Sequence, residues 1–116
     1  MTAITGAFKN YSISTTTAGT TASPYMFKQG YAMGTVTNPS AVTRTVTYYG
    51  VHQDDDGTQV GPYALKDEDG VAVTQTLLTL EMWSLPSAGA GVPILIAITT
   101  TGGTTGTTYM RFHFER

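Results

Sequence analysis

The sequence predicts an all-β protein, an antiparallel β-sandwich of jelly-roll or immunoglobulin-like topology with about seven to eight strands. Three observations favour this class. The length of 116 residues corresponds to one domain. The chain contains 23 threonines and 13 glycines, and β-branched threonine is favoured in strands and disfavoured in helices. Short runs that alternate apolar and polar residues recur between turn signals.

An N-terminal arm is expected over residues 1–23, followed by the sandwich over residues 24–116. A strand over 4–13 is able to pair with the body of the protein or with a neighbouring subunit. Residues 14–23 carry only small and hydroxyl side chains, so they bury too little apolar surface to offset the entropy of ordering. The apolar residues of the predicted strand, which we take as candidate assembly contacts, are Ile4, Phe8, Tyr11 and Ile13.

Alternation then marks the first strands of the body. Residues 25–33 form one strand, the Asn38-Pro39-Ser40 sequence forms a turn, and residues 41–51 form a half-buried strand. Residues 58–65 form a short strand that Gly61-Pro62 places at a sheet edge. The apolar parity comprises Tyr25, Phe27, Tyr31 and Met33 in the first strand and Val42, Val46 and Tyr48 in the second.

The remaining strands close the predicted domain. Val71 and Val73 lie on one parity, whereas Leu78, Leu80 and Met82 lie on the other, so we expect a bulge or break near 74–76 and a strand over 77–83. Pro86 to Gly91 form a flexible loop. The segment from Ile94 to Ile98 is apolar on both faces and is expected to be central. It forms a closing hairpin with 109–115, where Met110, Phe112 and Phe114 face inward.

Composition excludes several classes of function. The absence of cysteine excludes disulfides, thiol catalysis and cysteine-based metal sites. Only 12% of residues are charged and the net charge is −2, so we expect no nucleic-acid partner. The longest apolar run, residues 92–98, is too short to span a membrane, and residues 1–14 lack the features of a secretion signal. No hydrolase or phosphate-loop motif occurs, and His52 and His113 lie outside any triad-like spacing, so we expect no enzymatic activity.

Six of the eight acidic residues fall in two short turns between Asp54 and Asp69. If these turns approach each other, their carboxylates offer the hard oxygen ligands that calcium requires. The alternative is that both are ordinary hairpin turns, in which Asp accepts local backbone hydrogen bonds and Gly supplies a positive φ. No cofactor is expected on the second interpretation. The candidate calcium ligands are Asp54, Asp56, Asp67 and Asp69.

Aromatic residues are candidates for contacts with a protein partner or with a sugar. Tyr49 and Tyr109 lie on the parity opposite the apolar face of their strands, and we take both as candidate assembly contacts. Trp83 lies beside the glycine-rich loop, although a core position is the simpler interpretation. With so few charges, the surface favours packing against other protein.

The sequence resembles small virion proteins of tailed bacteriophages, especially capsid decoration or cement proteins. The resemblance lies in the Met1-Thr2-Ala3 start, the Thr15–Thr21 segment, the absence of cysteine, the Thr/Gly-rich turn 100–106 and the terminal strand 109–116. It implies a β-sandwich that binds the major capsid protein or other virion subunits, stiffens the phage head and often trimerises. It also implies location in the virion, after assembly in the host cytoplasm. The alternative function is a carbohydrate-binding or adhesin-like module, with or without calcium.

Overall fold

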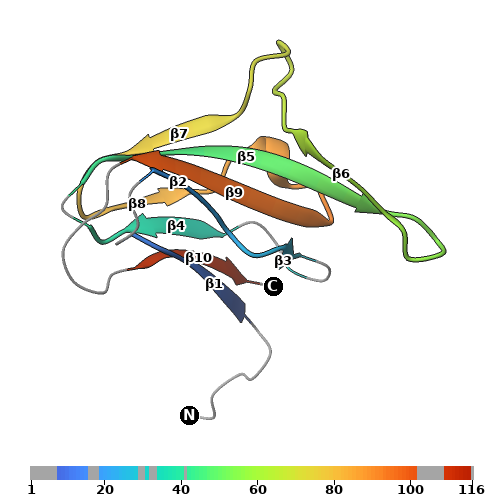
Figure 1. The fold of residues 1–116 in the computed structure, drawn as a ribbon, viewed down its shortest axis with the longest axis horizontal. Helices are drawn as coiled ribbons and strands as arrows, with labels where there is room; N and C mark the ends of the chain where they lie inside the picture. Colours follow the sequence, from blue (N-terminus) through green and yellow to red (C-terminus); the bar gives the residue numbers. More distant parts are fainter. Residues whose placement is uncertain are drawn as a thin grey trace.

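A computed structural model describes residues 8–15, 19–28, 31, 34–40, 42–101 and 109–115. Two antiparallel β-sheets pack face to face as a sandwich (Figure 1). This confirms the all-β sandwich predicted from the threonine content and the alternation. The first sheet contains, in spatial order, β1 (Phe8–Ser14), β10 (Tyr109–Glu115), β4 (Thr35–Asn38) and β8 (Glu81–Ser84). The second contains β2 (Gly19–Ala22), β9 (Ile94–Thr101), β5 (Arg44–Gln53) and β6 (Gln59–Ala64), with β3 (Met26–Phe27) on β9 and β7 (Thr74–Leu77) on β5.

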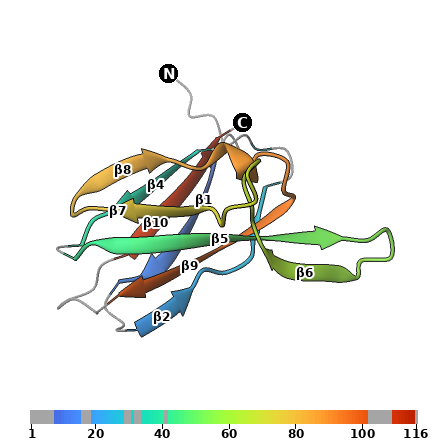
Figure 2. The ribbon, with the colours of Figure 1, turned by 90° about the horizontal axis from the view of Figure 1, so that it is seen from above.

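The pairings are nested along the chain. β1 pairs with β10, β2 and β3 with β9, β4 with β8, and β5 with β6 and β7, all antiparallel. The chain therefore behaves as one long two-stranded ribbon rolled into two sheets, which is the jelly-roll arrangement. Of the two topologies open from the sequence, the strand order selects the jelly roll. Figure 2 shows β9 between β2 and β5, the central position expected for this strand.

The ten strand segments correspond to eight strands of the roll. β2 and β3 both pair with β9 and form one interrupted strand. β6 and β7 lie one after the other along the edge of β5 that faces away from β9. This confirms the edge position predicted for the strand over residues 58–65. Between β6 and β7 the chain leaves the sheet as a small hairpin closed by the Lys66–Ala72 bridge. The backbone of Tyr48 anchors the base of this hairpin. Its carbonyl accepts from the Leu65 N–H at 3.0 Å, and its N–H donates to the Val73 carbonyl at 3.1 Å.

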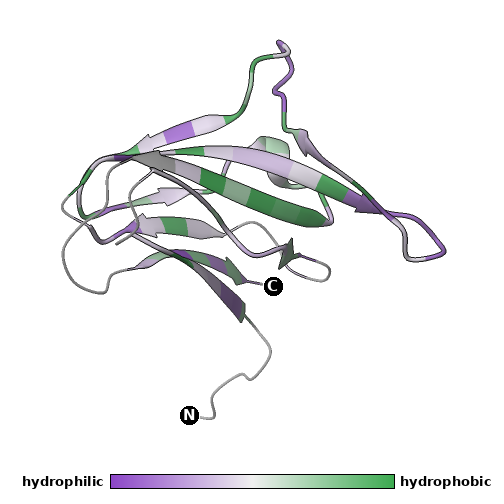
Figure 3. Ribbon diagram, viewed as in Figure 1, coloured by the Kyte–Doolittle hydropathy of each residue, from purple (hydrophilic) through white to green (hydrophobic). Residues whose placement is uncertain are grey.

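The main core lies between the sheets and follows the alternation of the strands. Met110, Phe112 and Phe114 of β10 are fully buried, as predicted, and they pack against Val46 and Tyr48 of β5 in one cluster. β9 carries a continuous hydrophobic segment (Figure 3). Both of its faces are buried, because Leu95 and Ala97 join the main cluster, whereas Ile94 and Ile96 form a second cluster with Val51. Burial of this set supplies the main driving force for folding.

Two cations are buried at the ends of the sandwich. The Lys28 ammonium donates to the carbonyl of Gly89, in the single-turn helix η1 (Ser87–Gly89), and burial lowers the pKa of this amine. The Arg44 guanidinium donates to the carbonyl of Thr15. Each bond ties a loop of the chain to the body of the fold, since a buried cation needs such partners.

Three local predictions were wrong. The closing hairpin does not form, because β9 and β10 lie in different sheets and pair with other strands. The chain breaks at the turn after β7 rather than at 74–76, so 77–83 is no single strand: β7 and β8 (Glu81–Ser84) lie in different sheets. In the segment from residue 25, Met26 and Lys28 are buried while Phe27 is 43% exposed, the reverse of the predicted parity.

The first strands also differ from the expected arm. Residues 8–14 form an edge strand of the first sheet and residues 19–22 pair with β9, so both segments belong to the sandwich of the same chain. Because β1 alternates Tyr11 and Ile13 inward, its apolar face is used within its own subunit. Residues 1–7 and 16–18 lie outside the described residues. Among the described residues no helix has both the length and the apolar character needed to cross a membrane.

Candidate functional site

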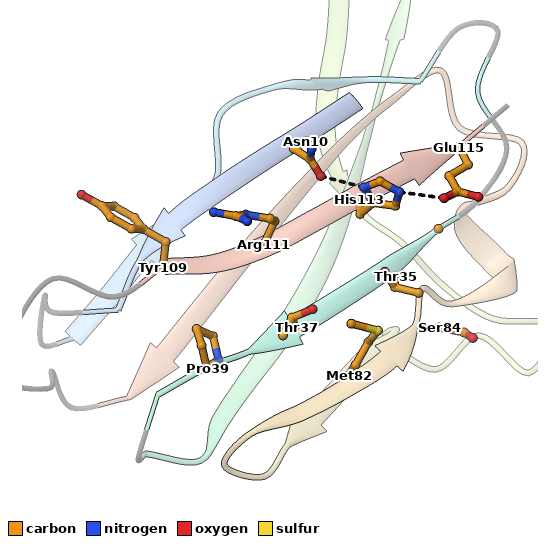
Figure 4. Close-up of a pocket in the computed structure, with 11 residues that line it drawn as sticks. Asn10, Thr35, Thr37, Pro39, Met82, Ser84, Tyr109, Arg111, His113 and Glu115 are labelled. Atoms are coloured by element: carbon orange, nitrogen blue, oxygen red, sulfur yellow. Dashed lines mark hydrogen bonds and ion pairs between the residues drawn. The ribbon is translucent and has the colours of Figure 1, made fainter. Parts of the chain in front are cut away.

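A groove of about 1050 Å³ lies on the solvent-facing side of the first sheet (Figure 4). We call it the first-sheet groove. Because side chains of a strand alternate between two faces, the residues that flank the buried ones of β10 all point into it. Its lining comprises Asn10, Gly34, Thr35, Thr37, Pro39, Met82, Ser84, Tyr109, Arg111, His113 and Glu115.

Strand register arranges these side chains in two rows across the sheet. In one row, Arg111 lies opposite Ser12 on one side and Thr37 on the other, and Thr37 lies opposite Met82. In the neighbouring row the order is Asn10, His113, Thr35 and Ser84. Neighbouring positions within a row have Cβ atoms about 4.5–5.5 Å apart. The groove therefore offers a compact array of hydroxyl, amide, imidazole and guanidinium groups.

The imidazole of His113 is held from both sides. Its Nδ1 lies 2.7 Å from Asn10 Oδ1 and its Nε2 lies 2.9 Å from Glu115 Oε1, and the ring of Phe8 packs at 5.4 Å between centroids. Both ring nitrogens therefore have a partner within hydrogen-bond distance, and these contacts fix the orientation of the imidazole.

The other end of the groove is more open. Tyr109 is 45% exposed, and Arg111 is exposed and makes no hydrogen bond or ion pair with any residue that the structure describes. Figure 4 shows both side chains extending from β10 at the end away from Glu115. The alternation with inward Met110, Phe112 and Phe114 correctly placed Tyr109 on the outer face. It did not reveal that β1, β4 and β8 share this face, because register between distant strands is not encoded in local alternation.

A second feature is the apolar turn, which we define as residues 78–83: the connection between β7 and β8 together with the first three residues of β8. Four large apolar side chains are exposed there: Leu78 at 56%, Leu80 at 79%, Met82 at 66% and Trp83 at 41%. Leu80 also has a φ of 58°, the one positive φ among the described non-glycine residues. Local alternation assigned these leucines to the apolar face of a strand, and the break at this turn is what exposes them.

Side-chain hydrogen bonds fix the conformation of the apolar turn. Glu81 Oε1 accepts from the Leu78 N–H at 2.7 Å and from Trp83 Nε1 at 3.1 Å. At the start of the turn, Nδ2 of Asn38, the last residue of β4, donates to the carbonyls of Leu77 and Leu78, both at 3.2 Å. Bonds of this kind at both ends mean that the exposed leucines are presented by an ordered turn.

The assembly contacts expected from the sequence are scattered over the molecule. Phe8, 52% exposed, and Tyr109 lie on the outer face of the first sheet, whereas Tyr49 packs against the second cluster on β5. Ile13 is 2% exposed and Tyr11 makes an edge contact with Phe114 at 6.1 Å, so both serve the core. Ile4 lies outside the described residues.

The two acidic turns do not come together. The turn at Asp54–Gly57 and the turn at Asp67–Gly70 lie at opposite ends of β6 (Figure 1). No three acidic or histidine side chains among the described residues form a group that could hold a metal ion. Instead, Asp67 Oδ1 accepts from the N–H groups of Asp69 and Val71, both at 2.9 Å. The Thr58 N–H, at 2.9 Å, likewise lowers the pKa of Asp56.

These hydrogen bonds correspond to the hairpin-turn interpretation of the acidic residues. The geometry thus gives the calcium alternative no preformed site. His52 is exposed. Comparison with known proteins adds nothing to the geometry, since no family model, curated protein or solved structure matches this chain.

Proposed function

We propose that this protein is a non-enzymatic structural subunit of a virion, a decoration or cement protein that binds the shell of a phage head. Its partners would be the major capsid protein or other virion subunits, together with further copies of the chain, most simply as a trimer. The jelly roll is compatible with this role, since viral capsid proteins use the same architecture. Fold alone does not decide function, however, so the proposal depends on the surface.

The observation that carries the proposal is that Leu80 combines an exposed side chain with an unfavourable backbone conformation. Its side chain is 79% exposed and its backbone has a φ of 58°. A left-handed conformation costs a non-glycine L-residue about 1–2 kcal/mol, and exposure of the side chain recovers none of this. In an isolated chain, asparagine or glycine would serve the turn better. Strained residues cluster at functional sites, so a strained and exposed leucine supports a role in binding.

The neighbours of Leu80 extend this contact. Leu78 and Met82 are also more than half exposed, so the apolar turn presents several large apolar side chains to solvent on a chain with few charges. Exposed apolar patches of this kind mark protein–protein contacts. The groups that hold the turn, Glu81 and Asn38, pre-organise it, which reduces the entropy lost on binding.

The location is tested by immunogold electron microscopy of particles purified from lysates of source cells, with antibodies against this chain. Label on phage heads is expected. A chain that stays in the soluble fraction and is absent from particles contradicts the proposal.

The surface is tested with Leu80→Asn, compared with Val71→Asn as a control. Val71 is 59% exposed on the separate 66–72 hairpin. Native mass spectrometry and co-sedimentation with heads should show that Leu80→Asn weakens association at least about tenfold, or about 1.4 kcal/mol, whereas Val71→Asn does not. Equal effects of the two substitutions would remove the apolar turn from the interface.

A further inference from the structure

We propose that the first-sheet groove binds a carboxylate-bearing oligosaccharide, such as one that contains sialic or uronic acid. This inference does not depend on assembly, because the groove is complete within one chain. Its lining residues come from one face of β1, β10, β4 and β8, together with Gly34 and Pro39, which flank β4.

The carboxylate preference follows from the two charges of the groove. Glu115 is engaged by His113 at 2.9 Å, whereas Arg111, two rows away from Glu115 along β10, has no partner among the described residues. A planar guanidinium binds a carboxylate through two parallel hydrogen bonds. One Arg without a partner among the described residues matches a single carboxylate.

The sugar preference follows from the rest of the lining. Thr35, Thr37 and Ser84 supply hydroxyl groups that both donate and accept, as sugar hydroxyls require. The 45% exposed ring of Tyr109, two residues from Arg111 on the same face, offers a platform for the C–H face of a pyranose.

A peptide ligand fits less well. The central strands β10 and β4 each pair with a neighbour on both sides, so they offer no free backbone groups for main-chain recognition. Large apolar anchors are also few, since Met82 and Tyr109 are the large apolar side chains of the lining. The groove is therefore better suited to a polyhydroxylated ligand than to an acidic peptide.

The test is an NMR titration of the ¹⁵N-labelled full-length chain with 3′-sialyllactose, trigalacturonic acid, neutral lactose and a hexaglutamate peptide. Saturable shifts on β10, β4 and β8 are expected with at least one acidic sugar, at a Kd of about 1 mM or tighter. Lactose and hexaglutamate should bind at least about tenfold more weakly.

Variants assign the contacts. Arg111→Gln and Tyr109→Ala should each weaken binding of the acidic sugar at least about tenfold, and Arg111→Lys should weaken it less, because it keeps the charge but not the planar fork. Lys66→Gln and Tyr63→Ala are matched controls on exposed residues outside the groove and should change nothing. The same spectra report whether each variant is folded.

Three results would each overturn the proposal. One is the absence of saturable shifts with either acidic sugar up to about 10 mM, which corresponds to less than about 3 kcal/mol of binding. The second is binding that Arg111→Gln leaves unchanged in a folded chain. The third is tighter binding of lactose or hexaglutamate than of the acidic sugars.

Discussion

The side-chain amide of Asn38 donates to the carbonyl oxygen of Leu77 at 3.2 Å, and this bond joins the last residue of β4 in the first sheet to the last residue of β7 in the second. Asn38 is fully buried and all its polar atoms are used. Nδ2 also donates to Leu78 and Val42, and Oδ1 accepts from Ser40. One side chain therefore closes the predicted 38–40 turn and holds the base of the apolar turn.

Replacing Asn38 by Ala should lower the free energy of unfolding by about 3 kcal/mol, because several buried backbone groups lose their partner. Asn38→Asp should cost at least as much at neutral pH, since a carboxylate would face three carbonyl oxygens. Denaturant titration measures both. The exposed Asn10→Ala serves as the matched control and should cost less than about 1 kcal/mol. If Asn38→Ala costs no more than the control, Asn38 does not hold the two turns.

Gly34 marks the point where the backbone of the groove is closest-packed. A Cβ atom added there would lie 1.6 Å from the carbonyl oxygen of His113, a backbone atom that cannot move alone. Gly34→Ala should therefore destabilise the fold by several kcal/mol or abolish folding. Gly91, around which no atom lies within 4 Å of an added Cβ, provides the control. Circular dichroism melting of both variants checks this, and similar melting temperatures would contradict the packing described here.

Tyr48 predicts how stability depends on alkaline pH. Its hydroxyl donates to Gln75 Oε1 at 2.7 Å, and burial raises its pKa well above the ordinary value of a tyrosine. The unfolded chain loses this proton near pH 10, whereas the folded chain keeps it. The free energy of unfolding should thus fall as pH rises above about 10, by up to about 1.4 kcal/mol per pH unit.

Tyr48→Phe should remove this part of the alkaline slope and cost about 1 kcal/mol at neutral pH through the lost hydrogen bond. Tyr63→Phe, at a 64% exposed tyrosine, should leave the slope unchanged. Urea denaturation between pH 8 and 11 distinguishes the two. An unchanged slope in Tyr48→Phe would show that other groups cause the alkaline loss.

Calcium should have little effect on this protein, because the carboxylates of its acidic turns bind their own backbone and lie at opposite ends of β6. Adding about 5 mM calcium should shift Tm by less than about 1 °C, since only a ligand that binds the folded state stabilises it. Differential scanning calorimetry with and without a chelator measures the shift. A rise of several degrees that the chelator reverses would require a calcium site.

Local patterns in the sequence were sufficient for the fold class and for several strands. The alternation of Val46 and Tyr48 on β5, of Met110, Phe112 and Phe114 on β10, and the two apolar faces of β9 follow directly from the period of two in a strand. Gly61-Pro62 correctly indicated an edge. These features depend on neighbours in the chain, which the sequence displays.

Features that depend on distant segments were missed. The local sequence pattern does not show that β9 and β10 lie in different sheets, or that the chain turns between Leu78 and Leu80. Both features follow from the way the two-stranded ribbon is rolled into two sheets. The first-sheet groove has the same origin, since four strands far apart in sequence supply it. Lys28 is buried against expectation because the carbonyl of Gly89, 61 residues away, accepts from it.

The central claim is that Leu80 is retained for binding at the expense of folding. Sedimentation velocity and thermal unfolding of Leu80→Asn, measured beside the unmodified chain, test it most directly. We expect opposite changes: weaker association, and a Tm higher by about 3–6 °C, since relief of about 1 kcal/mol of backbone strain raises Tm by that amount in a domain of this size. A variant that associates as strongly as the unmodified chain, or that melts at a lower temperature, would contradict the claim.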